Sequence, residues 1–290
     1  MISATELIAS TGCRISTIFS WYEADECHQM GAEMSRLIAL VLVILCSLAS
    51  VTLVEGADLS RRLTQQQVNT VILLLSQHTH QLVPNVLGDR LVRWPAGNIT
   101  YAILGSEAAP LVDEATRGVN AALHNIQASV TLVPTDSVRA ANIIIVYARD
   151  PAKLISSENY TSADIFGVNG APDSAANVAS MKAAIYNPDS QCVRVNRRLD
   201  NTIAKVIVFI SAARSEFLTR QCAFSMVLGG LGLSNVDVSG NSVMPPNSKI
   251  DTPTIEDVAA LQVLYAPQTQ SAATIGDALK LLHVNLPSGF

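Results

Sequence analysis

Two apolar, β-branched runs constrain the fold of this chain most strongly. Residues 141–146 read ANIIIV, and residues 204–210 read AKVIVFI. Runs of this kind are typical of strands buried within a sheet. Alternating or shorter apolar patterns predict further strands at 99–104, 130–133 and 183–186. The chain is therefore expected to build its core around a β-sheet.

Helical spacing of apolar residues marks the segments around these strands. Ser60 is a candidate N-cap for the first helix, and Thr254 with Asp257 resembles a capping box at the start of a later one. Gly232 is expected to end the helix that follows the last strand. Helices are predicted at 60–82, 109–127, 215–233, 254–265 and 273–283.

The N-terminal part of the chain contains an uncharged apolar run at 37–54, preceded by Met34-Ser-Arg. This pattern predicts a secretory signal peptide at 34–56, cleaved after Ala49 or Gly56. The alternative is a retained membrane anchor, because about 18 apolar residues are the lower limit for a span. Residues 1–33 are interpreted as an upstream extension that the native protein lacks. The protein is thus expected to be exported, either periplasmic or secreted, or else anchored to a membrane through 37–54 if this run is uncleaved.

The charge composition of the chain argues against one class of partner, nucleic acid. Charged residues make up 15% of the chain, the formal net charge is −5, and no stripe of lysine and arginine is present. Nucleic acid is therefore not expected as a partner. The folded domain is predicted to span 58–267, and a tail with a short helix follows at 268–290.

Only Cys192 and Cys222, of the 5 cysteines, lie in the predicted mature domain. Two cysteines in an exported protein often form a disulfide. Closing a loop of about 30 residues would stabilise the fold by roughly 3–4 kcal/mol in the chain-entropy model. Two buried free thiols are the alternative, since a sequence does not show disulfide geometry. A catalytic cysteine is disfavoured because no histidine lies near either one in sequence.

Three stretches resemble segments of the metzincin metallopeptidases, chiefly the matrixins and astacins. Residues 93–97, RWPAG, are similar to the Trp-Pro-Gly-Gly sequence that precedes the first strand in that group. The Gly-Leu pair at 232–233 resembles the end of the active-site helix. Residues 241–245, with Met244, and residues 252–265 resemble the Met-turn and the closing helix.

This resemblance covers most of residues 91–267. It implies an α+β, zincin-like fold: a mixed twisted sheet, an active-site-type helix, a Met-turn and a closing C-terminal helix. The edge strand of that sheet is expected at 206–210.

Metzincin chemistry requires the pattern H-E-x-x-H-x-x-G-x-x-H, in which three histidines bind zinc and the glutamate acts as general base. When the glycine of this pattern is aligned with Gly232, the first histidine falls on Ser225 and the glutamate on Met226. The second histidine falls on Gly229, and the third falls on Asn235. None of these residues can perform the corresponding task. No metal or other cofactor is expected, because residues 205–255 contain no histidine that a shift of register could use.

A second group is more similar: an uncharacterised bacterial family of lipoproteins with a zincin-like domain. Its members commonly carry a cysteine before the helix, a Glu-Glu pair and a glutamine in place of the histidines, then Gly-Leu and Asn. The matching positions are Cys222, Gly232, Leu233 and Asn235. Ser225, Met226 and Gly229 depart from the pattern. Cys192 also fits this family, which implies a Cys192–Cys222 pair.

The resemblance leads to two hypotheses about function. The favoured one is a non-catalytic, exported binding or structural module, whose cleft takes a peptide or protein by strand addition. The alternative is a hydrolase with relocated catalytic groups. The carboxylates in the right part of the chain for that alternative are Asp237, Asp251, Glu256 and Asp257. They are expected to be loop or helix-cap residues. No metal site is expected from the scattered histidines His78, His80, His124 and His283.

Overall fold

The protein has an α+β fold, with a five-stranded mixed sheet and six α-helices in the part of the chain that the structure describes. The structure is a computed structural model. It describes residues 63–76, 85–105, 109–157, 192–234 and 241–284, with the single residues 165, 167, 179 and 183. All of these belong to one unit, Val54–Phe290. Within these ranges no helix is long and apolar enough to span a bilayer. The predicted signal peptide or anchor and residues 1–33 lie outside them.

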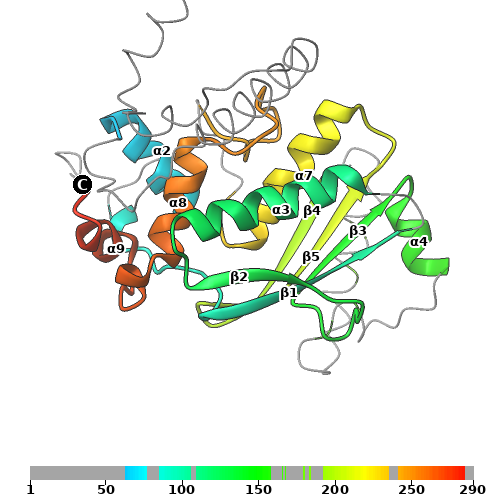
Figure 1. Cartoon of the computed structure of the whole chain (residues 1–290), viewed down its shortest axis with the longest axis horizontal. Coiled ribbons are helices and arrows are strands. Elements are labelled where there is room, and N and C mark those ends of the chain that lie inside the picture. The colour runs from blue at the N-terminus through cyan, green and yellow to red at the C-terminus, as the bar shows by residue number, and fades with distance from the viewer. Residues whose placement is uncertain are drawn as a thin grey trace, which may run out of the picture. The chain divides into compact units, whose positions relative to one another are not determined.

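The sheet has the strand order β2-β1-β3-β5-β4 (Figure 1). Its parallel part contains β1 to β3 and β5, and β4 pairs antiparallel with β5. The strands are β1 Gly97–Leu104, β2 Val130–Pro134, β3 Ile143–Ala148, β4 Cys192–Leu199 and β5 Thr202–Ser211. Every residue of β3 is buried, as its continuous apolar run predicts.

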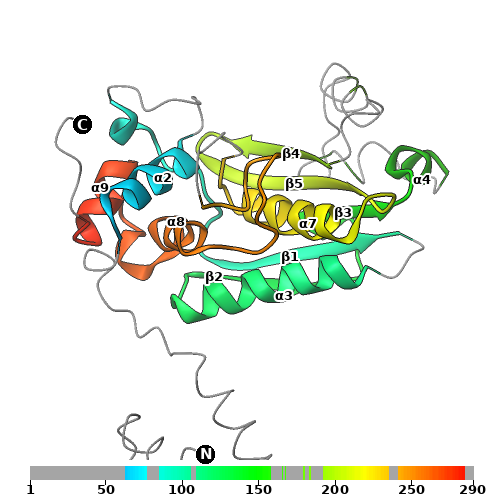
Figure 2. The ribbon, with the colours of Figure 1, turned by 90° about the horizontal axis from the view of Figure 1, so that it is seen from above.

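Helices cover both faces of the sheet. On one face, α3 and α7 run side by side (Figures 1 and 2) and share a core with alternate residues of β3 and β5, such as Ile143 and Val206. On the other face, α4 packs over Ile144 and Ile207. Both views place α2, α8 and α9 beyond one end of the sheet. The helices are α2 Gln65–Leu75, α3 Pro110–Asn125, α4 Pro151–Ser157, α7 Glu216–Gly230, α8 Ile255–Tyr265 and α9 Ile275–Leu281.

Most predicted elements are present, with shifted ends. The first helix is shorter than the predicted 60–82, because Thr64 and Gln67 form a capping box that starts α2 at Gln65. Ser60, the predicted cap, lies outside the described residues. The predicted strand at 183–186 is wrong at Ala183, which is helical. Alanine is the strongest helix former, and the short apolar pattern there was too brief to distinguish the two states.

The last two strands correct the expected edge of the sheet. Residues 206–210 belong to β5, which lies between β3 and β4 rather than at the edge. The outer strand is β4, which the sequence pattern did not predict. A two-residue connection, Asp200 and Asn201, joins β4 to β5, and Asp200 adopts a left-handed backbone with φ 55°. The strand that can accept a further strand on this side of the sheet is therefore β4.

Candidate functional site

Helix α7 carries three of the positions that correspond to the zinc motif. Ser215 caps its first turn, with its side chain accepting a hydrogen bond from the Leu218 amide. Ser225, Met226 and Gly229 all lie in the helix and are buried. Asn235, the fourth position, lies outside the described residues.

Ser225 and Met226 are parts of the packed interior. The Ser225 hydroxyl donates to the Cys222 carbonyl one turn earlier, at 3.1 Å. Met226 is 3% exposed and belongs to the main apolar core. A hydroxyl bonded within its own helix and a thioether among apolar side chains offer no ligand set for zinc.

Gly229 is overlaid by a side chain from the outer strand. A Cβ atom added at Gly229 would lie 0.9 Å from Nη1 and 2.1 Å from Cζ of Arg194. The guanidinium of Arg194 thus occupies the space that any side chain at position 229 would enter. Arg194 can pack in this position only because Gly229 has no side chain.

Arg194 has no counter-ion in the part of the chain that the structure describes. Its Nη1 atom is buried and has no hydrogen-bond partner. Burial, together with the nearby positive charge of Arg198, lowers the pKa of Arg194 to about 10. With that pKa the side chain remains charged at neutral pH. No carboxylate among the described residues offsets the charge.

Arg194 shares its face of β4 with Cys192, Asn196 and Arg198, because alternate residues of a strand point the same way. Asn196 donates from Nδ2 to the Gly229 carbonyl at 3.4 Å, whereas its buried Oδ1 has no partner. Two polar groups with unused hydrogen-bonding capacity therefore lie together over the last turn of α7.

A disulfide fixes this strand to the helix. Cys192, at the start of β4, is bonded to Cys222 in the middle of α7, and their Cα atoms are 6.1 Å apart. The predicted pairing is confirmed. The bond holds β4 against α7 two residues before Arg194, so it restricts how far Arg194 can move from Gly229.

The end of α7 is fully capped. Gly232 adopts φ 110°, and a Cβ there would lie 2.5 Å from the Val92 carbonyl oxygen, so glycine is required. The amides of Gly232 and Leu233 bond to the carbonyls of Gly229 and Leu228, which is a Schellman arrangement.

Side chains from distant segments satisfy the remaining carbonyls at this end. The Trp94 indole donates to the Gly230 carbonyl at 2.8 Å. The Tyr265 hydroxyl, from the last residue of α8, donates to the Leu231 carbonyl. These bonds join the chain before β1, the end of α7 and the end of α8.

The turn that contains Met244 is also saturated with hydrogen bonds. Gln221 of α7 donates from Nε2 to the carbonyls of Val243 and Pro245, both at 2.9 Å. Asp257 accepts from the Ser242 hydroxyl at 2.6 Å and from the Val243 amide at 3.1 Å. Met244 itself is completely buried. This turn is a rigid support beneath α7.

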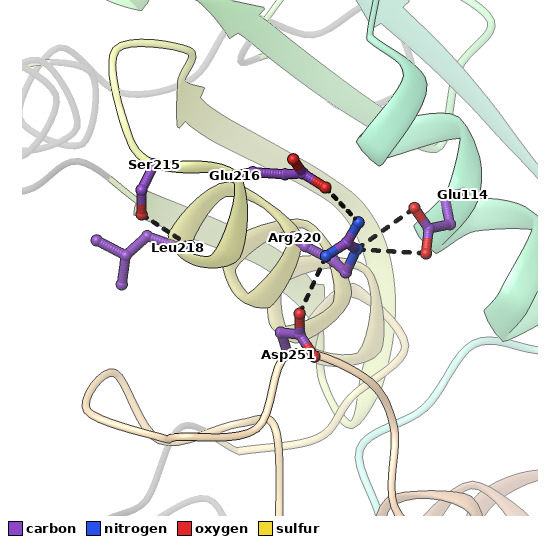
Figure 3. A network of polar contacts seen from close by, with 6 residues as sticks. All are labelled: Glu114, Ser215, Glu216, Leu218, Arg220 and Asp251. Atoms are coloured by element: carbon purple, nitrogen blue, oxygen red, sulfur yellow. Dashed lines mark hydrogen bonds and ion pairs between the residues drawn. The ribbon is translucent and has the colours of Figure 1, made fainter.

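The opposite end of α7 contains a second arginine with ample partners. Arg220 reaches Glu216 at 2.7 Å, Asp251 at 3.1 Å and Glu114 at 3.4 Å (Figure 3). The hydrogen bonds to Asp251 and Glu216 raise the pKa of Arg220. The network joins α3, α7 and the segment before α8.

Two of the carboxylates considered for a relocated active site have structural partners, a third is buried, and the fourth lies outside the described residues. Asp251 pairs with Arg220, and Asp257 completes the predicted capping box with Thr254. Glu256 is 2% exposed, and its Oε2 has no partner. Asp237 lies outside the described residues. In the described ranges no three His, Cys, Asp or Glu residues form a group that could hold a metal ion.

Comparison with known proteins adds no assignment. No protein-family model and no curated protein matches this chain. The residues that sequence reasoning missed are Arg194 and Asn196. A signal for them exists in residues 192–199, CVRVNRRL, where Val193 and Val195 alternate with polar residues at the period of a strand.

Proposed function

We propose that this protein is a non-catalytic, exported binding module built on a zincin-like scaffold. The observation that carries the proposal is the guanidinium of Arg194 over Gly229. In the metzincin pattern this position bears a zinc-ligating histidine. Here a fixed positive charge fills the corresponding space, and like charge disfavours a zinc ion at short range.

The contacts among the three metzincin-like stretches support the scaffold part of this proposal. Trp94 bonds to Gly230, and Tyr265 bonds to Leu231, at the end of the helix that Gly232 terminates. Arg93 donates to the carbonyls of Leu264 and Thr269 at 3.1 and 3.0 Å. Segments far apart in sequence, each similar to the same family, therefore meet at one end of α7.

The binding part of the proposal rests on the outer strand. Among the described strands, β4 and β2 each have a neighbour on one side only, and β4 is the edge strand that lies against α7 and carries Arg194. An unpaired strand edge offers backbone amides and carbonyls to an extended peptide. The partner is thus an extended peptide or a protein segment that lies along β4, with its side chains contacting the region of Arg194.

A peptide selection with two chemical controls tests the proposal. The full chain is mixed with a library of extended peptides, with and without a chelator. The bound and free peptides are then identified by mass spectrometry. A set of intact peptides, enriched equally with and without chelator, is expected. Cleaved peptides whose appearance stops with chelator would establish the metallopeptidase-like alternative. No enrichment in either sample would overturn the binding function.

A further inference from the structure

We propose that Arg194 is the residue that recognises a carboxylate of the bound peptide, and that this carboxylate is the counter-ion the fold does not supply. The inference rests on the proposed binding function and adds a chemical class to the ligand. Its structural basis is the buried Nη1 atom without a partner, beside the buried Oδ1 of Asn196, also without one.

An unpaired buried charge is rare because its removal from water is costly unless a partner compensates. The surroundings of Arg194 increase that cost. A second cation, Arg198 of β4, acts on Arg194 through its charge and lowers the pKa of Arg194. Both influences favour an anion at this position whenever one is offered.

The Nη1 atom of Arg194 makes none of the hydrogen bonds through which a cation commonly caps the C-terminus of a helix. A cation at a helix C-terminus can stabilise the helix by bonding its free carbonyls. The carbonyls at the end of α7 are occupied: Gly229 by Asn196 and Gly232, Gly230 by Trp94, and Leu231 by Tyr265. No bond joins the Arg194 Nη1 atom to any of them.

The chemistry of the site favours a carboxylate. A guanidinium presents paired N–H donors that match the two oxygens of a carboxylate. Asn196 bonds to Gly229 and keeps the adjoining side chain in place. The negative end of the α7 dipole lies close by and opposes any anion, and it opposes a phosphate with about two charges more than a singly charged carboxylate.

The carboxylate can come from an acidic side chain or from a peptide C-terminus, and three probes distinguish these sources. The first is a short acetylated Ala-Val-Glu-Val-Ala amide. The second replaces Glu by Gln and keeps a free C-terminal carboxylate. The third has Gln and a C-terminal amide, so it is neutral. Binding of each to the full chain is measured by fluorescence anisotropy, and acetate is titrated separately.

A side-chain signal reports directly on Arg194. In the chain labelled with ¹⁵N-arginine, the Nε resonance of Arg194 is identified by its loss in Arg194→Met. Carboxylate binding should shift this resonance saturably, while chloride at equal ionic strength should not. Arg117→Met, which removes an exposed arginine on α3, is the matched control and should leave the shift intact.

One charge-assisted contact should make a charged probe bind at least about tenfold more tightly than the neutral one. The advantage should disappear in Arg194→Met and persist in Arg117→Met. Equal binding of all three probes would overturn the role of Arg194 and leave the binding module standing. Absence of any shift with the peptides or acetate would overturn it as well. Stoichiometric zinc in the protein would instead overturn the proposed function.

Discussion

The arginines at the two ends of α7 differ in the number of polar partners that they contact. At the first turns, Arg220 contacts Glu114, Glu216 and Asp251 (Figure 3). Over the last turn, the Nη1 atom of Arg194 is enclosed and has no partner. The guanidinium of Arg220 therefore has three carboxylate partners, whereas the Nη1 atom of Arg194 has no hydrogen-bond partner.

This difference separates groups that maintain the fold from groups left available to a ligand. Arg220, Gln221 and Asp257 tie α7 to its neighbours, and their bonds are internal. Arg194 and Asn196 have buried polar atoms without hydrogen-bond partners on β4, the strand along which we propose that a peptide binds. Four variants test this separation, and they follow in order of decreasing expected change in stability.

Asp257→Ala should have the largest effect on stability. It removes a capping-box residue and leaves the Ser242 hydroxyl and the amides of Val243 and Thr254 without their acceptor. We expect the free energy of unfolding to fall by about 3–5 kcal/mol, measured by urea denaturation. A loss below about 1 kcal/mol would mean that the Met244 turn is not a rigid support.

Replacing both Cys192 and Cys222 by alanine should cost about 3–4 kcal/mol, the chain-entropy value for a loop of about 30 residues. The disulfide joins β4 to the middle of α7, so its loss should release the Arg194 side of the helix first. Hydrogen exchange measured by mass spectrometry should rise more in β4 than in α3. Uniform acceleration throughout the domain would contradict a local restraint.

Arg194→Met should stabilise the ligand-free protein by about 1–3 kcal/mol, because an apolar side chain replaces an unpaired buried cation. The thermal midpoint of the full chain is the measurement. A clear drop in the midpoint would show that Arg194 maintains the fold, as Arg220 does at the other end of α7.

Arg220→Met is the matched substitution at the opposite end and should act in the opposite direction. Three carboxylates lose their shared cation, and partly exposed ion pairs contribute about 0.2–1 kcal/mol each. We expect a small loss of stability that shrinks at high salt, because salt screens such pairs. An effect independent of salt would assign it to packing instead.

The elements with a single dominant periodicity could be predicted from the sequence. The continuous run ANIIIV became the fully buried β3, and Thr254 with Asp257 became the capping box of α8. Gly232 ended α7 because only glycine fits beside the Val92 carbonyl. These outcomes depend on local chemistry, which a sequence displays directly.

The outer strand and its arginine could not be predicted with the same patterns. Residues 192–199 contain three arginines and an asparagine, a composition that disfavours a strand prediction although Val193 and Val195 alternate correctly. The meeting of Arg194 with Gly229 depends on the pairing of β4 with β5 and on the packing of α7. Contacts of this kind join residues that are distant in sequence, so the local periodicity of the sequence does not predict them.

Zinc content is the most direct test of the proposal that this scaffold is similar to a metallopeptidase but has Arg194 and Gly229 where a zinc ion would bind. The full chain is purified with zinc in the buffers, dialysed, and measured by inductively coupled plasma mass spectrometry. Zinc well below one ion per chain is predicted. One zinc ion per chain, retained after dialysis, would contradict the account.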